Sequence, residues 1–389
     1  MNAMGRVCDV AVIGLGAVGS SALYQLAKRG IEAVGIDRFA PPHDRGSSHG
    51  ESRITRQAIG EGEAYVPLVL RSNAIWEELE SVTGERLLER CGFLFMTRDD
   101  AGTSHHGHAG FLRRTRDAAE RFKIDHEVLD AAEIGARFPQ FIGLAGDETG
   151  YYEPGGGYLR PERCIAASLS EARRAGARIV TGMRVCAIER GADQVRIRTE
   201  REEVVARHAI VATGPWLPQL AKPEIGRHVA IRRQVLHWFP VHDISAYRAG
   251  LTPSFIWTHG LDSAEQFYGF PPIDGLVKVA REDDAGDFDI EQASREADFD
   301  EGPAMAARHV TRHLAGLAAL PSKSAVCPYA VTPDTDFLIS SEEGATVVSA
   351  CSGHGFKHAA AVGEAAAALS IGELSSLDLP QFGPGRFNT

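Results

Sequence analysis

Three glycines and an aspartate near the N-terminus have the types and spacing needed to hold a nucleotide. Gly14, Gly16 and Gly19 follow the β-branched run 10–13 at G-x-G-x-x-G spacing, ahead of apolar positions with a helical period. The first glycine of such a unit allows the tight turn, the second admits a pyrophosphate, and the third lets the helix pack closely on the strand. Asp37 ends the next apolar run, where an acid accepts hydrogen bonds from an adenosine ribose. The unit predicts dinucleotide binding, in preference to a glycine-rich turn in an unrelated α/β domain.

The other motifs assign no reactive group to the protein alone. The sequence contains no G-x-S-x-G, H-E-x-x-H or phosphate-loop motif, so hydrolase and kinase chemistry has no support. Its cysteines are scattered without a C-x-x-C pair, which favours neither a zinc site nor a disulfide framework. They are Cys8, Cys91, Cys164, Cys186, Cys327 and Cys351. A bound cofactor, either FAD or a nicotinamide nucleotide, is therefore expected to supply the reactivity.

A histidine run raises a metal hypothesis that the surrounding sequence does not favour. His105, His106 and His108 are flanked by glycine and serine, with no carboxylate or thiol nearby in the sequence. We predict a mobile, solvated loop over residues 101–108 and no metal site.

Composition limits the class of protein and its partners. The chain has 389 residues, enough for about two domains, with 44% hydrophobic and 24% charged residues. Its 41 basic and 52 acidic residues give a net charge of −11, which argues against nucleic acid or an anionic membrane as partner. No apolar run has the length of a membrane helix, and the N-terminus lacks the features of a signal peptide. A cytoplasmic protein, monomeric or weakly self-associating, is expected.

The elements that must position these residues follow from periodicity. Residues 65–82, 111–122, 161–175 and 305–317 have helical patterns, and runs at 234–239, 255–258, 266–270 and 276–280 read as short strands. The run 209–216 reads as a buried strand that re-enters the dinucleotide-binding sheet. The polar loop 41–56 should lie at the cofactor, since ligands of doubly wound sheets collect at the carboxyl ends of strands.

Several segments in this order resemble the monomeric sarcosine oxidase and N-methyltryptophan oxidase family. They are residues 49–56, 60–71, 209–216, 268–271, 325–329, 336–339 and 352–357. The resemblance runs from about residue 9 to about residue 370. It implies an FAD enzyme that oxidises the C–N bond of a secondary or N-substituted amino acid to an imine, while O2 is reduced to hydrogen peroxide.

The fold expected from these patterns is α/β. A discontinuous, Rossmann-like FAD-binding domain is expected over residues 1–90, 150–225 and 325–389. An inserted substrate-binding domain built on an antiparallel sheet is expected over residues 91–149 and 226–324.

The resemblance also implies roles at the flavin. Cys327 matches the cysteine that attaches the flavin through a thioether, and Lys278 matches the lysine that lies over the flavin and activates O2. Lys278 also interrupts an apolar strand, where an ammonium is costly without an electron-rich partner. Arg53 is expected against the flavin ring. Ser48, His49 and Gly355 are expected beside the cofactor.

A second group is implied at the substrate. Arg56 and Lys357 match the pair that holds the substrate carboxylate, with Lys357 also at the cofactor, and two such cations suit a single anion. Tyr268 and Tyr329 match aromatic positions at the substrate face, although either could equally be core packing. Gly353 fits a backbone contact to the substrate amine.

Two departures from the family pattern affect the expected substrate. Glu282 replaces a histidine four residues after the lysine, and Ile59 replaces an aromatic residue. Sarcosine itself is therefore not the expected substrate, and an acid at this position suggests a larger or more cationic amino acid. Glycated amino acids and cyclic imino acids remain alternatives within the class. A nicotinamide-binding module and a non-catalytic flavin-binding protein are the alternatives outside it.

Overall fold

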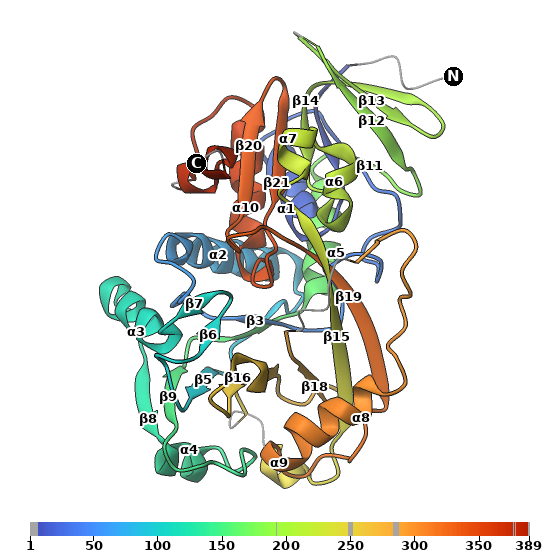
Figure 1. Cartoon of the computed structure of the whole chain (residues 1–389). Helices are drawn as coiled ribbons and strands as arrows, with labels where there is room; N and C mark the ends of the chain where they lie inside the picture. Colours follow the sequence, from blue (N-terminus) through green and yellow to red (C-terminus); the bar gives the residue numbers. More distant parts are fainter. Residues whose placement is uncertain are drawn as a thin grey trace.

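Two large sheets organise the computed structural model, one in each half of the molecule (Figure 1). The structure describes residues 7–191, 193–247, 252–282, 288–375, 377 and 379–387. Among these residues, no helix is long and apolar enough to cross a membrane.

The first sheet has a parallel centre in the order β11-β2-β1-β14-β21. An antiparallel meander of β12 and β13 extends it beside β14, and β20 pairs antiparallel with β21. Its strands are β1 (Cys8–Ile13), β2 (Ala33–Ile36), β11 (Arg178–Val180), β12 (Val185–Arg190), β13 (Val195–Thr199), β14 (Glu203–Val211), β20 (Leu338–Glu342) and β21 (Ala345–Ser349). The re-entry predicted for residues 209–216 is confirmed for residues 209–211, which pair with both β1 and β21, although β14 begins earlier and ends at Val211.

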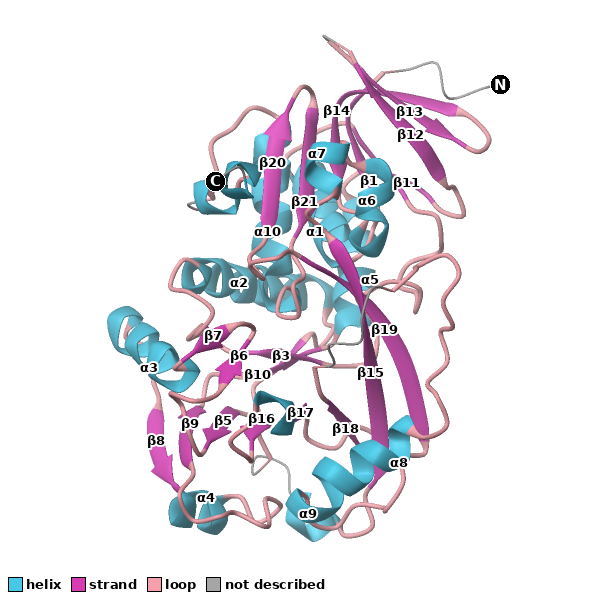
Figure 2. Ribbon diagram, in the orientation of Figure 1, coloured by secondary structure: helices cyan, strands magenta, loops and turns pink. Residues whose placement is uncertain are grey.

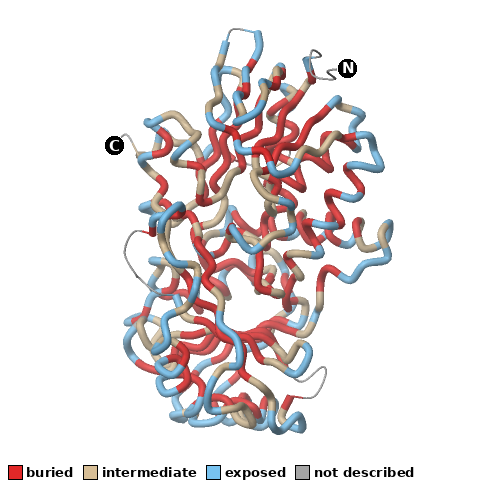
Figure 3. The backbone as a smooth tube through the Cα atoms, turned by 90° about the vertical axis from the view of Figure 1, so that its right-hand side faces the viewer, coloured by how far each residue is buried: buried red, intermediate tan, exposed pale blue. Residues whose placement is uncertain are grey.

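The helices α1 (Ala17–Lys28) and α10 (Ala359–Ser370) pack against central strands of this sheet. The helix α5 (Pro161–Arg174) packs on α1, and α2 (Tyr65–Thr83) packs on α10. The helix α1 contacts both α5 and α10, and their apolar faces share one core with α2. A Cβ on Gly363 of α10 would lie 2.6 Å from the Cβ of Ser21 in α1, so the small residue sets how closely these helices approach. Figure 3 shows the buried backbone that runs through the middle of both halves.

The second sheet is antiparallel apart from one parallel pair, β5 with β16. In spatial order its strands are β19 (Lys323–Val331), β15 (Ala230–Pro240), β18 (Leu276–Ala280), β17 (Gln266–Gly269), β16 (Ser254–Thr258), β5 (Phe93–Thr97), β9 (Thr149–Glu153) and β8 (Glu127–Asp130). The strand β19 lies at the edge of the sheet, where Pro328 removes no interior hydrogen bond. The mixed α/β fold predicted from the sequence is confirmed.

Smaller elements complete the chain (Figure 2). A third sheet joins β3 (Arg53–Thr55), β10 (Gly157–Leu159) and β4 (Leu88–Glu89). The remaining helices are α3 (Phe111–Phe122), α4 (Ala131–Arg137), α6 (Leu217–Leu220), α7 (Pro223–Gly226), α8 (Glu301–Met305) and α9 (Thr311–His313), with a π-helical turn at Ala306–Val310 between the last two.

Two local predictions were wrong. The helical pattern at 305–317 ends at His313, because Leu314 adopts an extended conformation and pairs with Phe141. Residues 101–108 include a hairpin of β6 (Ser104–His105) and β7 (His108–Ala109) in place of a solvated loop. The domain boundaries stay a prediction, and β9 and β19 pair in the second sheet although most of each was assigned to the FAD-binding domain.

Candidate active site

One long cavity runs from the carboxyl ends of the first sheet to a face of the second. Gly14, Asp37 and Ala212, which follow β1, β2 and β14, line one end of it. Lys278 of β18 and Cys327 of β19 line the other. A nucleotide bound at the strand ends of the first sheet would therefore reach the face of the second sheet.

Two glycines of this turn are needed for different reasons, one for packing within the protein and the other for contact with a ligand. A Cβ on Gly19 would lie 1.8 Å from the carbonyl oxygen of Gly14, so this glycine serves the packing of α1 on β1. A Cβ on Gly16 would meet only Ser48 Oγ, at 3.8 Å, and Gly16 lines the cavity. The protein itself leaves room for a side chain at position 16. The absence of a side chain there therefore fits close approach of a pyrophosphate to the backbone.

This contrast gives a testable pair of variants. We expect Gly16→Ala to fold with a loss of about 1 kcal/mol or less, the scale of a helix N-cap change, yet to bind little FAD. Gly19→Ala should lose ~3 kcal/mol or more, because overpacking here is against backbone. Thermal unfolding of flavin-free protein and FAD content per chain measure the two effects. Equal destabilisation by both variants would contradict this division.

Asp37 is buried at the end of β2, and its carboxylate is already held by the backbone. Its Oδ2 accepts a hydrogen bond from the Leu15 N–H at 2.7 Å, and its Oδ1 accepts one from the Phe39 N–H at 2.7 Å. Each carboxylate oxygen has a further lone pair, so the fixed orientation leaves capacity for ribose hydroxyls.

Lys278 is buried on the cavity side of β18. Its Nζ donates hydrogen bonds to the carbonyl oxygens of Gly50 at 2.7 Å and Ser52 at 2.5 Å, and lies 4.2 Å from the centroid of the Phe270 ring. Burial, followed by the nearby Arg53 guanidinium, lowers the pKa of this amine well below its usual value. An ammonium has three N–H donors, so one remains for a ligand in the cavity.

Cys327 lies beside the Arg53 guanidinium. Arg53 Nη2 donates to the Cys327 Sγ at 3.2 Å and to the carbonyl oxygen of Ser47 at 2.8 Å. Burial raises the pKa of the thiol, and Arg53 opposes this rise because its charge stabilises a thiolate. Cys327 is thus a cavity-lining cysteine with a cation on its sulfur.

Arg56, which is 1% exposed, does not stand free in the cavity. Its Nη2 lies 2.8 Å from both carboxylate oxygens of Glu61, and its Nη1 donates to the carbonyl oxygen of Ala58 at 2.9 Å. Lys357 Nζ lies 3.9 Å from Glu61 Oε1. Burial lowers the pKa of Lys357 to about 7, although Glu61 opposes this. Arg56 and Lys357, which were predicted to share a substrate carboxylate, therefore share the carboxylate of Glu61 in this structure.

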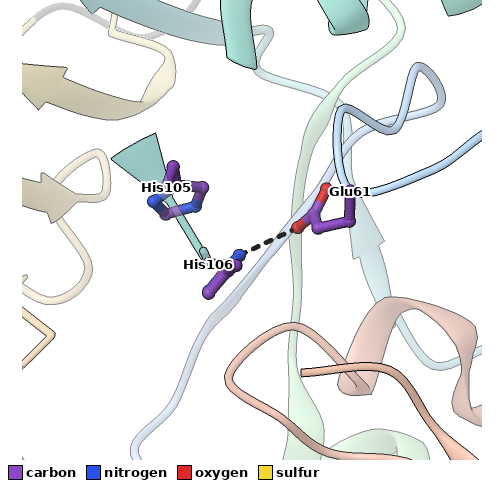
Figure 4. A group of neighbouring side chains, drawn as sticks. All are labelled: Glu61, His105 and His106. Atoms are coloured by element: carbon purple, nitrogen blue, oxygen red, sulfur yellow. Dashed lines mark hydrogen bonds and ion pairs between the residues drawn. The ribbon is translucent and has the colours of Figure 1, made fainter. Parts of the chain in front are cut away.

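The histidine hairpin lies against this carboxylate, which contradicts the predicted solvated loop. His105 is 4% exposed and the His106 side chain 8% exposed. His106 Nδ1 is 3.0 Å from Glu61 Oε1, and its Nε2 forms an ion pair with Glu282 (Figure 4 draws the Glu61 contact). Burial disfavours the charged form, but Glu282 and Glu61 raise the pKa of His106 to about 9. The prediction of a solvated loop failed because the carboxylates that pair with His106 come from segments distant in the sequence.

The remaining predicted residues fall into two sets. Those that line the cavity are Tyr268, Tyr329, Gly353, Ser48 and Gly355. His49 and Gly19 do not line it among the described residues. Burial, followed by Arg53, lowers the pKa of the His49 imidazole to about 4, so His49 is a neutral buried side chain.

Sequence reasoning assigned no role to Glu61, His106 or His354. The side chain of His354 is 1% exposed and its Nδ1 lies 4.0 Å from Glu61 Oε1. Glu61 could have been found from Arg56, because a buried guanidinium requires a carboxylate and Glu61 lies only five residues further along. Nothing in the sequence indicated that the histidine hairpin would reach it.

The glycine turn, the strand-end acid and the cavity that joins the two sheets fit a protein that binds a dinucleotide cofactor. Residues 9–369 match the family model described as FAD dependent oxidoreductase, and the chain belongs to this family. Its cofactor is therefore FAD, and the nicotinamide alternative has no support.

Sequence comparison places the chain within a group of amine oxidases. It is 38% identical over 393 residues to a monomeric sarcosine oxidase of Streptomyces avermitilis, covering 98% of each chain. It is 33% identical over 386 residues to an N-methyl-L-tryptophan oxidase of Yersinia pestis, covering 97% of this chain and 99% of the relative. The resemblance recognised from the motifs is confirmed, and the protein is an FAD-dependent oxidase of the sarcosine oxidase type.

Solved structures share the fold over nearly the whole length. The open form of NikD, an unusual amino acid oxidase, superposes with a TM-score of 0.84 at 23% identity, covering 97% of this chain and 98% of the other. L-proline dehydrogenase from P. horikoshii superposes with a TM-score of 0.82 at 20% identity, covering 98% of each.

Proposed function

We propose that this protein oxidises the C–N bond of a secondary or N-substituted amino acid to an imine. FAD, when bound, would supply the two-electron acceptor for this oxidation, with O2 reduced to hydrogen peroxide. The protein's own groups bind the amino acid, orient it and supply charge where it is needed. A nitrogen that binds as the neutral amine needs no strong protein base.

The observation that carries this proposal is the pair of buried cations that share one carboxylate. Arg56 and Lys357 come from segments about 300 residues apart in sequence and converge on Glu61. A guanidinium gives two parallel hydrogen bonds to a carboxylate, and an ammonium adds a point charge. A substrate carboxylate would bind by replacing Glu61 as their partner.

The amine end of the substrate would lie near Gly353, which has a positive φ of 81°. A Cβ at this position would lie 2.9 Å from His106 Nε2 and 3.1 Å from Glu282 Oε1, so the backbone is bare where it faces these groups. Tyr268 and Tyr329 would bound the same region. We propose that the Gly353 carbonyl accepts a hydrogen bond from the amine.

Removal of the Arg56 side chain tests the carboxylate site. We expect Arg56→Ala to raise KM for an amino-acid substrate by the equivalent of ~2–3 kcal/mol, the scale of a hydrogen bond to a charged group. This corresponds to about 30- to 150-fold. Steady-state oxygen consumption measures it. An amine substrate without a carboxylate should show little change, which separates lost recognition from general damage.

The matched control is Arg71→Ala. Arg71 makes a bidentate pair with Glu364, and its side chain is 41% exposed and does not line the cavity. An unchanged KM for carboxylate substrates in Arg56→Ala would mean that the carboxylate binds elsewhere.

The substrate side chain is the open part of this proposal. Glu282, which suggested a cationic substrate, is paired with His106, so a substrate cation would have to compete with an imidazolium. Ile59 is buried in the core. A panel of N-methyl, glycated and cyclic imino acids with peroxide detection tests the class. Peroxide from none of them would contradict oxidation of a secondary amino acid.

We propose further that the flavin is covalently attached through Cys327, for which the Arg53 contact supplies support. The cytoplasmic location and the monomeric or weakly self-associating state stay predictions from the sequence.

A further inference from the structure

Glu61, His105 and His106 form a group of side chains held in place by contacts that the proposed substrate binding does not need. One ligand atom of each residue lies within 4.8 Å of the others. Glu61 follows β3, whereas the two histidines belong to the hairpin of β6 and β7 (Figure 4). His106 and Gly107 both have positive φ, 47° and 76°, so a tight turn holds the His106 ring at the hairpin tip.

Hydrogen bonds on the outer side of the group determine which nitrogen of His105 faces it. The Gln266 Nε2 donates to Thr258 Oγ1 at 2.7 Å, which leaves the Gln266 Oε1 as an acceptor for His105 Nδ1 at 2.6 Å. His105 Nδ1 therefore carries the proton, and Nε2 has a lone pair. This Nε2 is buried and has no hydrogen-bond partner among the described residues. A buried lone pair without a partner is costly unless a ligand occupies it.

Each of the three side chains also has a partner outside the group. Gln266 holds His105, Glu282 pairs with His106 Nε2, and Arg56 pairs with Glu61. Metal-binding histidines almost always donate their second N–H to such a partner, which sets the tautomer and the ring orientation. A hydrogen-bonded carboxylate ligand is typical of the same sites.

We propose that Glu61, His105 and His106 form a binding site for a divalent cation of the zinc class. Two imidazoles and a carboxylate suit zinc or its transition-metal neighbours, whereas calcium and magnesium prefer oxygen ligands alone. The metal would bind His105 Nε2, His106 Nδ1 and a Glu61 oxygen, and water would complete a tetrahedron.

One of the three ligand distances is already close to that required, and the other two are no longer than 4.8 Å. Zinc bonds of about 2.0–2.1 Å place two ligand atoms of a tetrahedron roughly 3.3 Å apart. His106 Nδ1 and Glu61 Oε1 are 3.0 Å apart, joined now by a proton that the metal would replace. The Arg56 cation opposes a second positive charge, and Glu282 favours it, so the affinity should fall below that of sites without a neighbouring arginine.

Occupancy of this site would act on the proposed substrate pocket. A metal that holds Glu61 keeps that carboxylate beside Arg56 and Lys357, where the substrate carboxylate is proposed to bind. The metal site itself does not rest on the proposed function, because binding can be measured without any substrate.

Calorimetric titration of the purified holoenzyme with zinc chloride tests the site, after dialysis against a chelator. We expect saturable binding of one zinc ion per chain and no binding of magnesium at the same concentration. Absence of saturable zinc binding, or equal binding of both ions, would overturn the proposal.

Variants assign the bound metal to this group. His105→Asn removes a ligand and should weaken zinc binding by about 100-fold or more, while Gln266→Leu removes only the outer partner and should weaken it by about 10- to 100-fold. His108→Asn, in the same hairpin but outside the group, is the control and should bind zinc as the wild type does. Wild-type affinity in both His105→Asn and Gln266→Leu, or lost binding in His108→Asn, would overturn the assignment. Far-ultraviolet circular dichroism reports whether each variant is folded. If His105→Asn does not fold, Gln266→Leu tests the assignment instead.

Discussion

Serine in place of Cys327 is expected to turn a flavin that stays with the denatured chain into one that is released completely. A thioether is a carbon–sulfur bond and survives acid precipitation, whereas a flavin held only by non-covalent contacts leaves when the fold is lost. The serine hydroxyl offers no comparable nucleophile at this position. Attachment would exchange one C–H bond of the flavin for the C–S bond, with O2 as the two-electron acceptor. Arg53, 3.2 Å from the sulfur, would favour the thiolate form of Cys327 that this exchange needs.

The measurement is the visible absorbance of pellet and supernatant after acid precipitation. Wild-type protein should give a yellow pellet, and Cys327→Ser a yellow supernatant. Cys351→Ser is the matched control, since Cys351 lines the same cavity and lacks the arginine contact among the described interactions. A yellow pellet from Cys327→Ser would place the attachment elsewhere. A yellow supernatant from the wild type would leave FAD bound without a covalent link.

The second large effect is expected from Lys278→Met, in the half of the reaction that consumes O2. Reduction of O2 creates negative charge, and a fixed cation stabilises that charge before any solvent reorganises. Lys278 Nζ is anchored by two backbone carbonyls, so its position is held. Loss of one preorganised charged group of this kind costs about 10²- to 10³-fold in rate. Methionine is similarly long and apolar, and it should keep the packing against Phe270.

Separate rapid-mixing experiments measure the two halves of the reaction. Reduction of the bound flavin by substrate without oxygen should slow by less than about 10-fold, since Lys278 is not proposed to act in that step. Reoxidation by O2 should slow by the full amount. Lys323→Met is the control, because Lys323 lies on the edge strand β19, which β15 separates from β18, with a half-exposed side chain over Trp238. Equal losses in both halves would point to damaged folding and would remove Lys278 from the oxygen reaction.

Local patterns carried much of the prediction. The glycine spacing and the apolar run 33–36 predicted the first strand, turn, helix and strand, and β2 spans Ala33–Ile36 as expected. The helix at 111–122 was predicted at both ends, because a helical period and its flanking residues are encoded within one segment. The hairpin at residues 104–109 was missed, since its strands are only two residues long and their pairing depends on neighbours from other segments.

The sequence by itself determined the cofactor-binding glycine turn and the family, and it identified Arg56, Lys278, Cys327 and Lys357 as candidate site residues. These features depend on short local motifs, which can be recognised without knowing how the chain folds. Only the tertiary structure decided which charges meet. Glu61 pairs with Arg56 from its own segment but with His106 from a hairpin about 45 residues away, and Glu282, two residues after β18, pairs with His106. Ion pairing acts over a few ångströms in space, so its partners depend on how the segments fold together and leave no regular spacing in the sequence.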